Sequence, residues 1–270
     1  MKIICLIENT QGHPLCTSEH GLCLYAETEN HHILFDAGQT DASMKNAEAL
    51  GIDIKGIDSL FLSHGHYDHS GGIEKFAEIN QSAPIYAQKA ALLPCWHNER
   101  YIGVSDNFKK LNNLVLLNGN KKIDGELYVF SGIKGRRLFP KGNLELEREA
   151  DGRRIKDDFC HEQCLVISEN GKNILLSGCA HNGILNILDR YNELFDTDPD
   201  IVISGFHMMK STEYTEEDIN IIKNTAAELM KKNTLYYSGH CTGQAAFDIM
   251  KSIMGDRLTA IHSGEAVFEI

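Results

Sequence analysis

Short apolar runs alternate along the chain with amphipathic stretches, and this alternation predicts strands and helices that follow one another. Apolar runs rich in Ile, Leu, Val and Phe are typical of buried strands. A helix is expected at 73–79, where apolar residues recur at helical spacing after Gly71 and Gly72. In the first part of the chain, the predicted strands are 2–7, 22–27, 32–35, 57–62 and 83–87.

The second part of the chain opens with a predicted hairpin. Its strands, 163–168 and 173–177, flank the segment Glu169-Asn170-Gly171-Lys172, and an Asn-Gly pair favours a tight hairpin turn. Because both parts combine strands with helices, we expect an α/β protein in which two sheets pack face to face with helices outside, as a single domain over 1–270. The later helices are expected at 184–194, 216–231 and 244–254, and the later strands at 201–203, 235–237 and 258–261.

Residues 88–157 interrupt this pattern. The segment is rich in Gly, Asn, Lys and Arg, and strand-like runs stand out only at 114–117 and 127–130. We interpret it as a lid or insert that forms one wall of a substrate site, and a solvated surface loop is the alternative. Its basic side chains would suit a phosphate group, for which Arg offers two parallel donors. The candidate lid residues are Trp96, His97, Arg100, Tyr101, Lys109, Lys110, Lys134, Arg136 and Arg137.

Composition narrows the class of protein. Of the 270 residues, 42% are hydrophobic and 24% are charged, as in ordinary globular proteins. The formal net charge of −12 argues against a nucleic-acid partner, because nucleic-acid binding depends on positive charge. The apolar start at 1–7 is too short for a signal sequence or a membrane span. The eight cysteines show no paired spacing, so we expect reduced thiols in a cytoplasmic protein.

The most informative segment is His64-Gly65-His66-Tyr67-Asp68-His69, directly after the run at 57–62. Imidazole nitrogens and carboxylate oxygens are the ligands of hydrolytic zinc-type sites. His64 and His66 alternate along an extended segment, so they project to the same side and can share one ion. Asp68 and His69, where the chain turns into a helix, can bind a second. Two ions roughly 3.5–4 Å apart would clamp a bridging hydroxide and polarise a phosphoryl or carbonyl oxygen.

Further histidines follow predicted strands. His181, His207 and His240 each lie within three residues of a glycine, which lets the backbone approach a site closely. Together with the motif, they are candidates for metal ligands or substrate contacts, and a histidine hydrogen-bonded near a loop is the alternative for each. His20, just before the strand at 22–27, is a candidate for the mouth of the site or a structural residue.

The chain resembles members of the metallo-β-lactamase superfamily. Their signature is His-x-His-x-Asp-His after a strand, with an earlier strand that ends in an Asp-Gly turn, here Leu34-Phe35-Asp36-Ala37-Gly38. The resemblance covers essentially the whole chain and implies a four-layer αββα sandwich of two mixed sheets. The chain is also similar to one branch, the dihydropterin-ribofuranosylaminobenzene-phosphate synthase-like proteins, which are mostly uncharacterised metal-dependent hydrolases. The segments that carry this similarity are 19–22, 64–72, 177–184, 205–207 and 239–243.

The resemblance implies two divalent metal ions, with zinc expected and manganese or iron as alternatives. It places one ion on the motif residues His64 and His66 with a third histidine. It places the second on Asp68 and His69 with a last histidine, for which His240 is preferred to His207.

The third histidine is left open between His161, which precedes the hairpin, and His181, which we favour because its segment matches the branch. Common members of the superfamily carry a bridging aspartate in a Gly-Asp step after the hairpin, where this chain has Gly178-Cys179. Cys179 is therefore a further candidate ligand, or an inert buried thiol.

Metal-dependent hydrolysis of a small, anionic substrate is the function that these residues predict. A metal-activated water would attack a phosphoester, a phosphodiester or a related ester-type bond. Asp68 would hold a metal and orient the nucleophile, with His207 and His20 near the substrate. The resemblance implies one alternative, a transferase that condenses a dihydropterin diphosphate with an aromatic amine phosphate. A non-catalytic metal-binding or redox protein is the second alternative.

Overall fold

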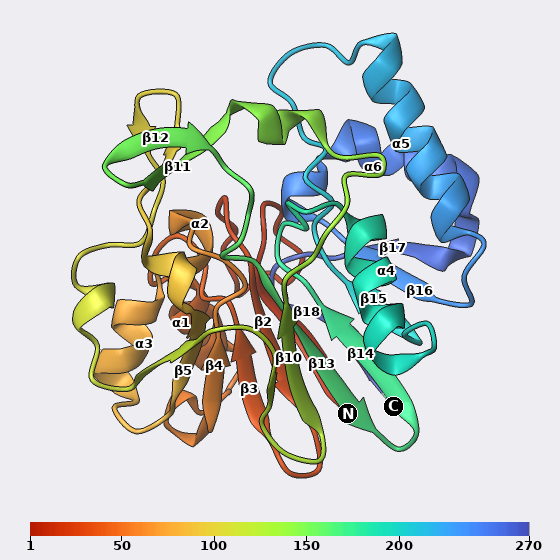
Figure 1. Cartoon of the computed structure of the whole chain (residues 1–270). Helices are drawn as coiled ribbons and strands as arrows, with labels where there is room; N and C mark the ends of the chain where they lie inside the picture. The colour runs from red at the N-terminus through yellow and green to blue at the C-terminus, as the bar shows by residue number, and fades with distance from the viewer. Residues whose placement is uncertain (270) are drawn as a thin grey trace.

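Two mixed seven-stranded sheets packed face to face form the centre of the computed structural model, which describes residues 1–269 (Figure 1). In spatial order, the first sheet contains β18 (Glu265–Glu269), β1 (Lys2–Ile7), β2 (Cys23–Glu27), β3 (His32–Phe35), β4 (Ser59–Phe61), β5 (Ile85–Gln88) and β8 (Leu114–Leu117). Neighbours are antiparallel from β18 to β3 and parallel from β3 to β8.

The second sheet has the same mixed character. In spatial order, it contains β17 (Leu258–Ala260), β16 (Leu235–Ser238), β15 (Ile201–Ile203), β14 (Lys172–Leu176), β13 (Gln163–Glu169), β10 (Leu127–Ser131) and β9 (Lys121–Lys122). Neighbours are parallel from β17 to β14 and antiparallel from β14 to β9. The carboxyl ends of β14, β15 and β16 therefore meet at one edge of the sheet.

A continuous apolar core lies between the two sheets. Phe35 and Phe61 from the first sheet and Leu165 and Ile203 from the second are fully buried in it. Strands of this kind are buried on both faces, so they read in the sequence as unbroken apolar runs rather than as alternating ones. That property explains why these strands were predictable.

Helices cover the outer face of each sheet and complete the αββα sandwich that the sequence predicted (Figure 1). On the first sheet lie α1 (Ala42–Ala49) and α3 (Ile73–Ile79), and on the second lie α4 (Ile184–Phe195), α5 (Glu216–Leu229) and α6 (Gln244–Met254). The apolar stripe of α4, which includes Ile184, Leu188 and Tyr191, faces the second sheet. Within residues 1–269, no helix combines the length and the apolar character needed to cross a bilayer.

Residues 88–157 divide among three sheets. β8 forms an edge of the first sheet, and β9 and β10 form an edge of the second. The remaining strands form a small antiparallel sheet, here termed the lid sheet, which Figure 1 shows above α2 (Tyr67–Ser70). In spatial order, its strands are β12 (Arg153–Lys156), β11 (Leu146–Ala150), β6 (Cys95–His97) and β7 (Arg100–Tyr101).

Candidate metal centre

The His64–His69 motif occupies the turn that leaves β4 and enters α2. Its four candidate ligands are at most 7% exposed, so the motif points into the protein. Gly71 explains how the turn packs so tightly, because a Cβ at this position would overlap the carbonyl oxygen of Gln39. The predicted strand at 57–62 and the predicted helix at 73–79 are confirmed as β4 and α3, whereas the short helix α2, which contains Asp68 and His69, was not predicted.

One group of donor atoms forms around the second half of the motif. It contains Asp68, His69, His240 and Cys179, whose ligand atoms all lie within 4.8 Å of one another. His69 Nε2 lies 3.1 Å from Cys179 Sγ and 3.2 Å from His240 Nε2. Asp68 Oδ2 lies 3.3 Å from His240 Nε2. Two ring nitrogens, a carboxylate oxygen and a sulfur thus lie close together.

A second group forms around the first half of the motif. His64, His181 and Cys179 bring their ligand atoms within 4.8 Å of one another. His64 Nε2 lies 3.2 Å from His181 Nε2, and the ring of His66 lies 4.6 Å from that of His64 and 4.7 Å from that of His181. Because Cys179 belongs to both groups, its sulfur lies between them, where the superfamily pattern expects a bridging ligand.

Oxygen atoms of neighbouring residues hold four of these imidazoles in orientation. Each ring uses Nδ1 for this contact and turns Nε2 toward the centre, an arrangement that is usual around metal-binding histidines. The contacts join His64 to Ser63 Oγ at 2.8 Å, His69 to Asp36 Oδ2 at 2.6 Å, His181 to Asn143 Oδ1 at 2.8 Å and His240 to Asn9 Oδ1 at 2.9 Å.

All three histidines around the first half of the motif have lowered pKa values. Burial lowers the pKa of His64 and of His181 well below the ordinary range, and it lowers the pKa of His66 to about 3. A neutral imidazole offers a lone pair to a metal ion. These three side chains are therefore in the protonation state that metal binding requires.

His69 differs because it lies between two carboxylates. Burial acts to lower its pKa, but Asp36 and Asp68 outweigh burial and raise it to about 9. Without a metal ion the ring therefore carries a proton, and a divalent cation would supply the positive charge in its place. Burial also raises the pKa of the Cys179 thiol, so a thiolate at this position needs a cation beside it. The donor set fits a divalent metal of the zinc type.

The other predicted residues surround this centre. His20 Nε2 lies 3.3 Å from Asp68 Oδ2, and its side chain is 39% exposed. The ring of His207 lies 4.2 Å from that of His181, and its buried Nδ1 has no hydrogen-bond partner. His207 also shares a donor group with Cys179 and Cys241.

His161 lies to one side. Its Nε2 lies 3.1 Å from Asp157 Oδ2, and its ring centroid is 6.0 Å from that of His64. The structure thus brings His181 closer than His161 to His64, and it groups His240 with Asp68. Which of these histidines ligate stays a prediction.

The sequence-predicted lid residues are mostly engaged with the protein itself. Arg137 pairs with Asp189 and Glu228, and Lys109 pairs with Asp106. The guanidinium of Arg100 lies over the ring of Tyr67. Sequence reasoning missed the orienting residues Asn9 and Asn143, and it used Asp36 only as a sign of the family. It also missed Cys95 and Asp157, which lie beside His161.

Comparison with known proteins places the chain in a family. Residues 17–217 match the model of the metallo-beta-lactamase superfamily. An uncharacterized protein of Methanocaldococcus jannaschii is 30% identical over 88% of this chain and 89% of its own length. The 7,8-dihydropterin-6-methyl-4-(beta-D-ribofuranosyl)-aminobenzene-5'-phosphate synthase of the same organism is 27% identical, over 99% of this chain and 96% of its own.

Solved structures agree with this placement. Tm1679, described as a metal-dependent hydrolase of the beta-lactamase superfamily, is 30% identical with a TM-score of 0.84, and the match covers 100% of this chain and 99% of that one. YhfI of Bacillus subtilis, a metallo-beta-lactamase fold protein, shares the fold with a TM-score of 0.58 at 13% identity, over 98% of this chain and 99% of its own. The motif, the two-sheet architecture and these likenesses agree that the chain belongs to the metallo-beta-lactamase superfamily.

Proposed function

We propose that the protein is a metal-dependent hydrolase that acts on a phosphoester, a phosphodiester or a related ester-type bond of a small anionic molecule. The observation that carries this proposal is the position of Cys179 between two groups of inward-facing, buried histidines. Two adjoining donor groups with one shared ligand are what a pair of divalent ions needs.

Each half of the centre would hold one ion. The proposed ligands of the first ion are His64, His66 and His181, and those of the second are Asp68, His69 and His240, with Cys179 between the two groups. When bound, the ions lower the pKa of water and stabilise negative charge that develops on the substrate.

Residues of the chain itself would orient the reacting groups. His20 and His240 both contact Asp68 Oδ2, so the carboxylate is held at a fixed position. Burial acts to raise the pKa of Asp68, but His69, His20 and His240 together hold it well below its usual range. Asp68 is therefore ionised at neutral pH. Its carboxylate can accept a hydrogen bond from the attacking water.

His207 marks the side on which the substrate would bind. It lines a small surface pocket with Lys141, Met209, Lys210 and Tyr214, and its ring lies 4.2 Å from that of His181. Both lysines of this pocket are paired with carboxylates, Lys141 with Glu217 and Lys210 with Asp218. The preference for an anionic substrate therefore rests on the centre itself, because two bound divalent cations would attract negative charge.

An Asp68→Asn variant tests the proposal. The zinc- or manganese-loaded wild type is expected to hydrolyse at least one of three probes: a phosphodiester, a phosphomonoester or a lactone. Asp68→Asn is expected to lower kcat/KM for that probe by at least about a hundredfold, because a carboxylate ligand is lost. Asp248→Asn, an exposed carboxylate on α6, is the control and should leave the rate unchanged. A fully loaded wild type that hydrolyses none of the probes would contradict the proposal.

A transferase is the second candidate, because the synthase from Methanocaldococcus jannaschii matches nearly the whole chain at 27% identity. This activity would join a dihydropterin diphosphate to an aromatic amine phosphate, with diphosphate as the leaving group. The protein is incubated with a dihydropterin diphosphate and an aromatic amine phosphate, and mass spectrometry of the products separates the two candidate activities. A condensed product would favour the transferase, and a free dihydropterin alcohol without the condensed product would favour hydrolysis.

A further inference from the structure

The connection between β12 and β13, residues 157–162, lies against the candidate centre without belonging to the donor groups that share Cys179. Its side chains are unusually buried for a connection: Phe159 is 1% exposed, His161 is 0% exposed and Glu162 is 1% exposed. Histidine and glutamate are rarely buried in this way unless their polar atoms have partners. The partners of these two side chains therefore indicate their role.

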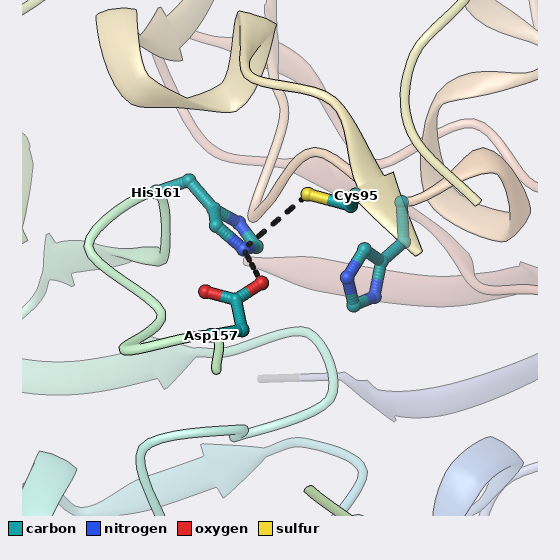
Figure 2. Close-up of side chains that lie close together, drawn as sticks. Cys95, Asp157 and His161 are labelled. Atoms are coloured by element: carbon teal, nitrogen blue, oxygen red, sulfur yellow. Dashed lines mark hydrogen bonds and ion pairs between the residues drawn. The ribbon is translucent and has the colours of Figure 1, made fainter. Parts of the chain in front are cut away.

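Both ring nitrogens of His161 are engaged within the protein. Nδ1 accepts a hydrogen bond from the backbone N–H of Gly65 at 3.2 Å, which places the ring proton on Nε2. Nε2 donates to Asp157 Oδ2 at 3.1 Å, and Figure 2 shows this carboxylate turned toward the ring. Gly65 stands between the candidate ligands His64 and His66, so His161 fixes the backbone that joins them.

Asp157 is itself held in place. Its Oδ1 accepts from the backbone N–H of Phe159 at 2.7 Å, and its own N–H donates to the carbonyl oxygen of Leu146, in β11, at 3.1 Å. These contacts link His161 to the lid sheet. The ring of Phe159 is stacked on that of His181, with centroids 4.8 Å apart and an interplanar angle of 7°. The same short connection therefore contacts His181 as well as the motif.

Glu162 contacts the turn from which His181 extends. Its Oε1 accepts the backbone N–H of His181 at 2.6 Å. Its Oε2 accepts the backbone N–H of Asn182 at 2.9 Å and the side-chain amide of the same residue at 2.8 Å. A buried carboxylate is costly unless hydrogen bonds or an opposite charge compensate it, and here three N–H groups of one turn do so. Glu162 thus holds the backbone of this turn.

The two histidines of the other donor group are held from elsewhere. His69 contacts Asp36, and His240 contacts Asn9. Within residues 1–269, no hydrogen bond joins the connection 157–162 to either of these two histidines. The connection therefore acts on one half of the centre.

We propose that His161 and Glu162 are positioning residues for the first ion, and that neither is a ligand. The proposal rests on the proposed function, in which His64, His66 and His181 bind that ion. His161 would set the spacing of the two motif histidines, and Glu162 would set the turn that brings the third histidine to them. Residues that orient metal ligands change metal affinity by about 10- to 100-fold. The first ion depends on this connection, and the second does not.

Zinc binding by full-length variants tests the role of His161. His161→Leu accepts no hydrogen bond, and it should weaken zinc binding at the first position by about tenfold. His161→Asn should restore most of the affinity, because the amide oxygen can accept from the Gly65 N–H in place of Nδ1. If the ring only filled space, Leu would replace it better than Asn. Cys160→Ser, at an exposed neighbouring position, is the control and should leave both ions unchanged.

Glu162→Gln gives an independent test at the other contact. Its amide group would direct an N–H toward the N–H donors of the turn, so at least one hydrogen bond is lost. We expect zinc binding at the first position to weaken by about tenfold. Should His161→Leu fail to fold, a folded Glu162→Gln with wild-type affinity at this position would still overturn the proposal.

Anomalous scattering at the zinc edge, from crystals equilibrated at a series of buffered zinc concentrations, measures the occupancy of each position. In His161→Leu, the peak beside His64 and His181 should disappear at zinc concentrations at which the peak beside Asp68 and His240 persists. Loss of neither peak, or equal loss of both, would overturn the proposal.

This measurement does not depend on hydrolysis, so the two proposals can fail separately. A wild type that binds both ions and hydrolyses none of the probes would contradict the proposed function, and the positioning role would still be decided by the variants. A wild type in which the peak beside His64 and His181 never forms would overturn both.

Discussion

At the level of single residues, the sequence identified the kinds of donor atom but could not pair all of them. The motif residues were predictable as candidate ligands because they are neighbours in the chain. His161 and His181 stand at either end of the same hairpin, so spacing cannot choose between them. Only the packing of the turn after β14 brings His181 Nε2 to 3.2 Å from His64 Nε2.

The residues that orient the histidines could not be predicted from sequence patterns, for a similar reason. Asn143 lies 38 positions from His181, and Asn9 lies 231 positions from His240. Amide side chains are common in loops, and no local periodicity marks the two that contact a histidine. Asp36 had a local signal, because it ends a predicted strand, but its contact with His69 depends on how two strands lie side by side.

Substitution of the two competing histidines provides a direct prediction. His181→Ala is expected to weaken metal retention at the catalytic pair, and to lower the hydrolysis rate, at least about tenfold more than His161→Ala does. The measurement is hydrolysis at a series of chelator concentrations. If His161→Ala proves the more damaging, the third ligand of the first ion is His161 and our assignment is wrong.

At the level of helices and strands, the elements with strong apolar patterns were predictable and the others were not. The helices α4, α5 and α6 begin at or near the predicted residues. The strands of the lid sheet were missed because pairing, not an apolar face, defines them; all four residues of β12 are exposed. α1 was missed for a similar reason, since its sequence, Ala-Ser-Met-Lys-Asn-Ala-Glu-Ala, has a weak apolar stripe.

The start of α5 carries a prediction about pH. Asp218 accepts hydrogen bonds from the Thr215 backbone N–H and hydroxyl, and from Lys210 Nζ at 2.6 Å. The ion pair with Lys210 is the main cause that lowers the pKa of Asp218 to about 2 from an ordinary 3.8. Because the native state holds this carboxylate ionised, the contact stabilises the fold above pH 3.8, and the stabilisation is lost as the pH falls toward 2.

We therefore expect Asp218→Asn to lower the free energy of unfolding by about 1–2 kcal/mol at neutral pH. The loss should shrink as the pH falls from about 5 toward 2. Urea unfolding of the metal-free protein across this range measures it. Glu216→Gln, which removes a charge from the same helical turn at an exposed position, is the control. A difference that does not depend on pH would contradict the assigned pKa.

At the level of the whole molecule, the fold explains why residues so distant in the chain share one site. The motif follows β4 in the first sheet, and Cys179, His207 and His240 follow β14, β15 and β16 in the second. Parallel strands end at the same edge of a sheet, and ligands bind at such edges. The face-to-face packing of the two sheets then joins both edges into one centre. The general architecture followed from the alternation of strands and helices, together with the family resemblance.

In the proposed function, two metal ions bind on either side of Cys179. Anomalous X-ray scattering at the zinc edge, from crystals of the zinc-loaded protein, would locate both ions. We expect one peak beside His64 and His181 and a second beside Asp68, His69 and His240, with Cys179 Sγ between them. A single peak at this centre, or peaks that avoid these side chains, would contradict it.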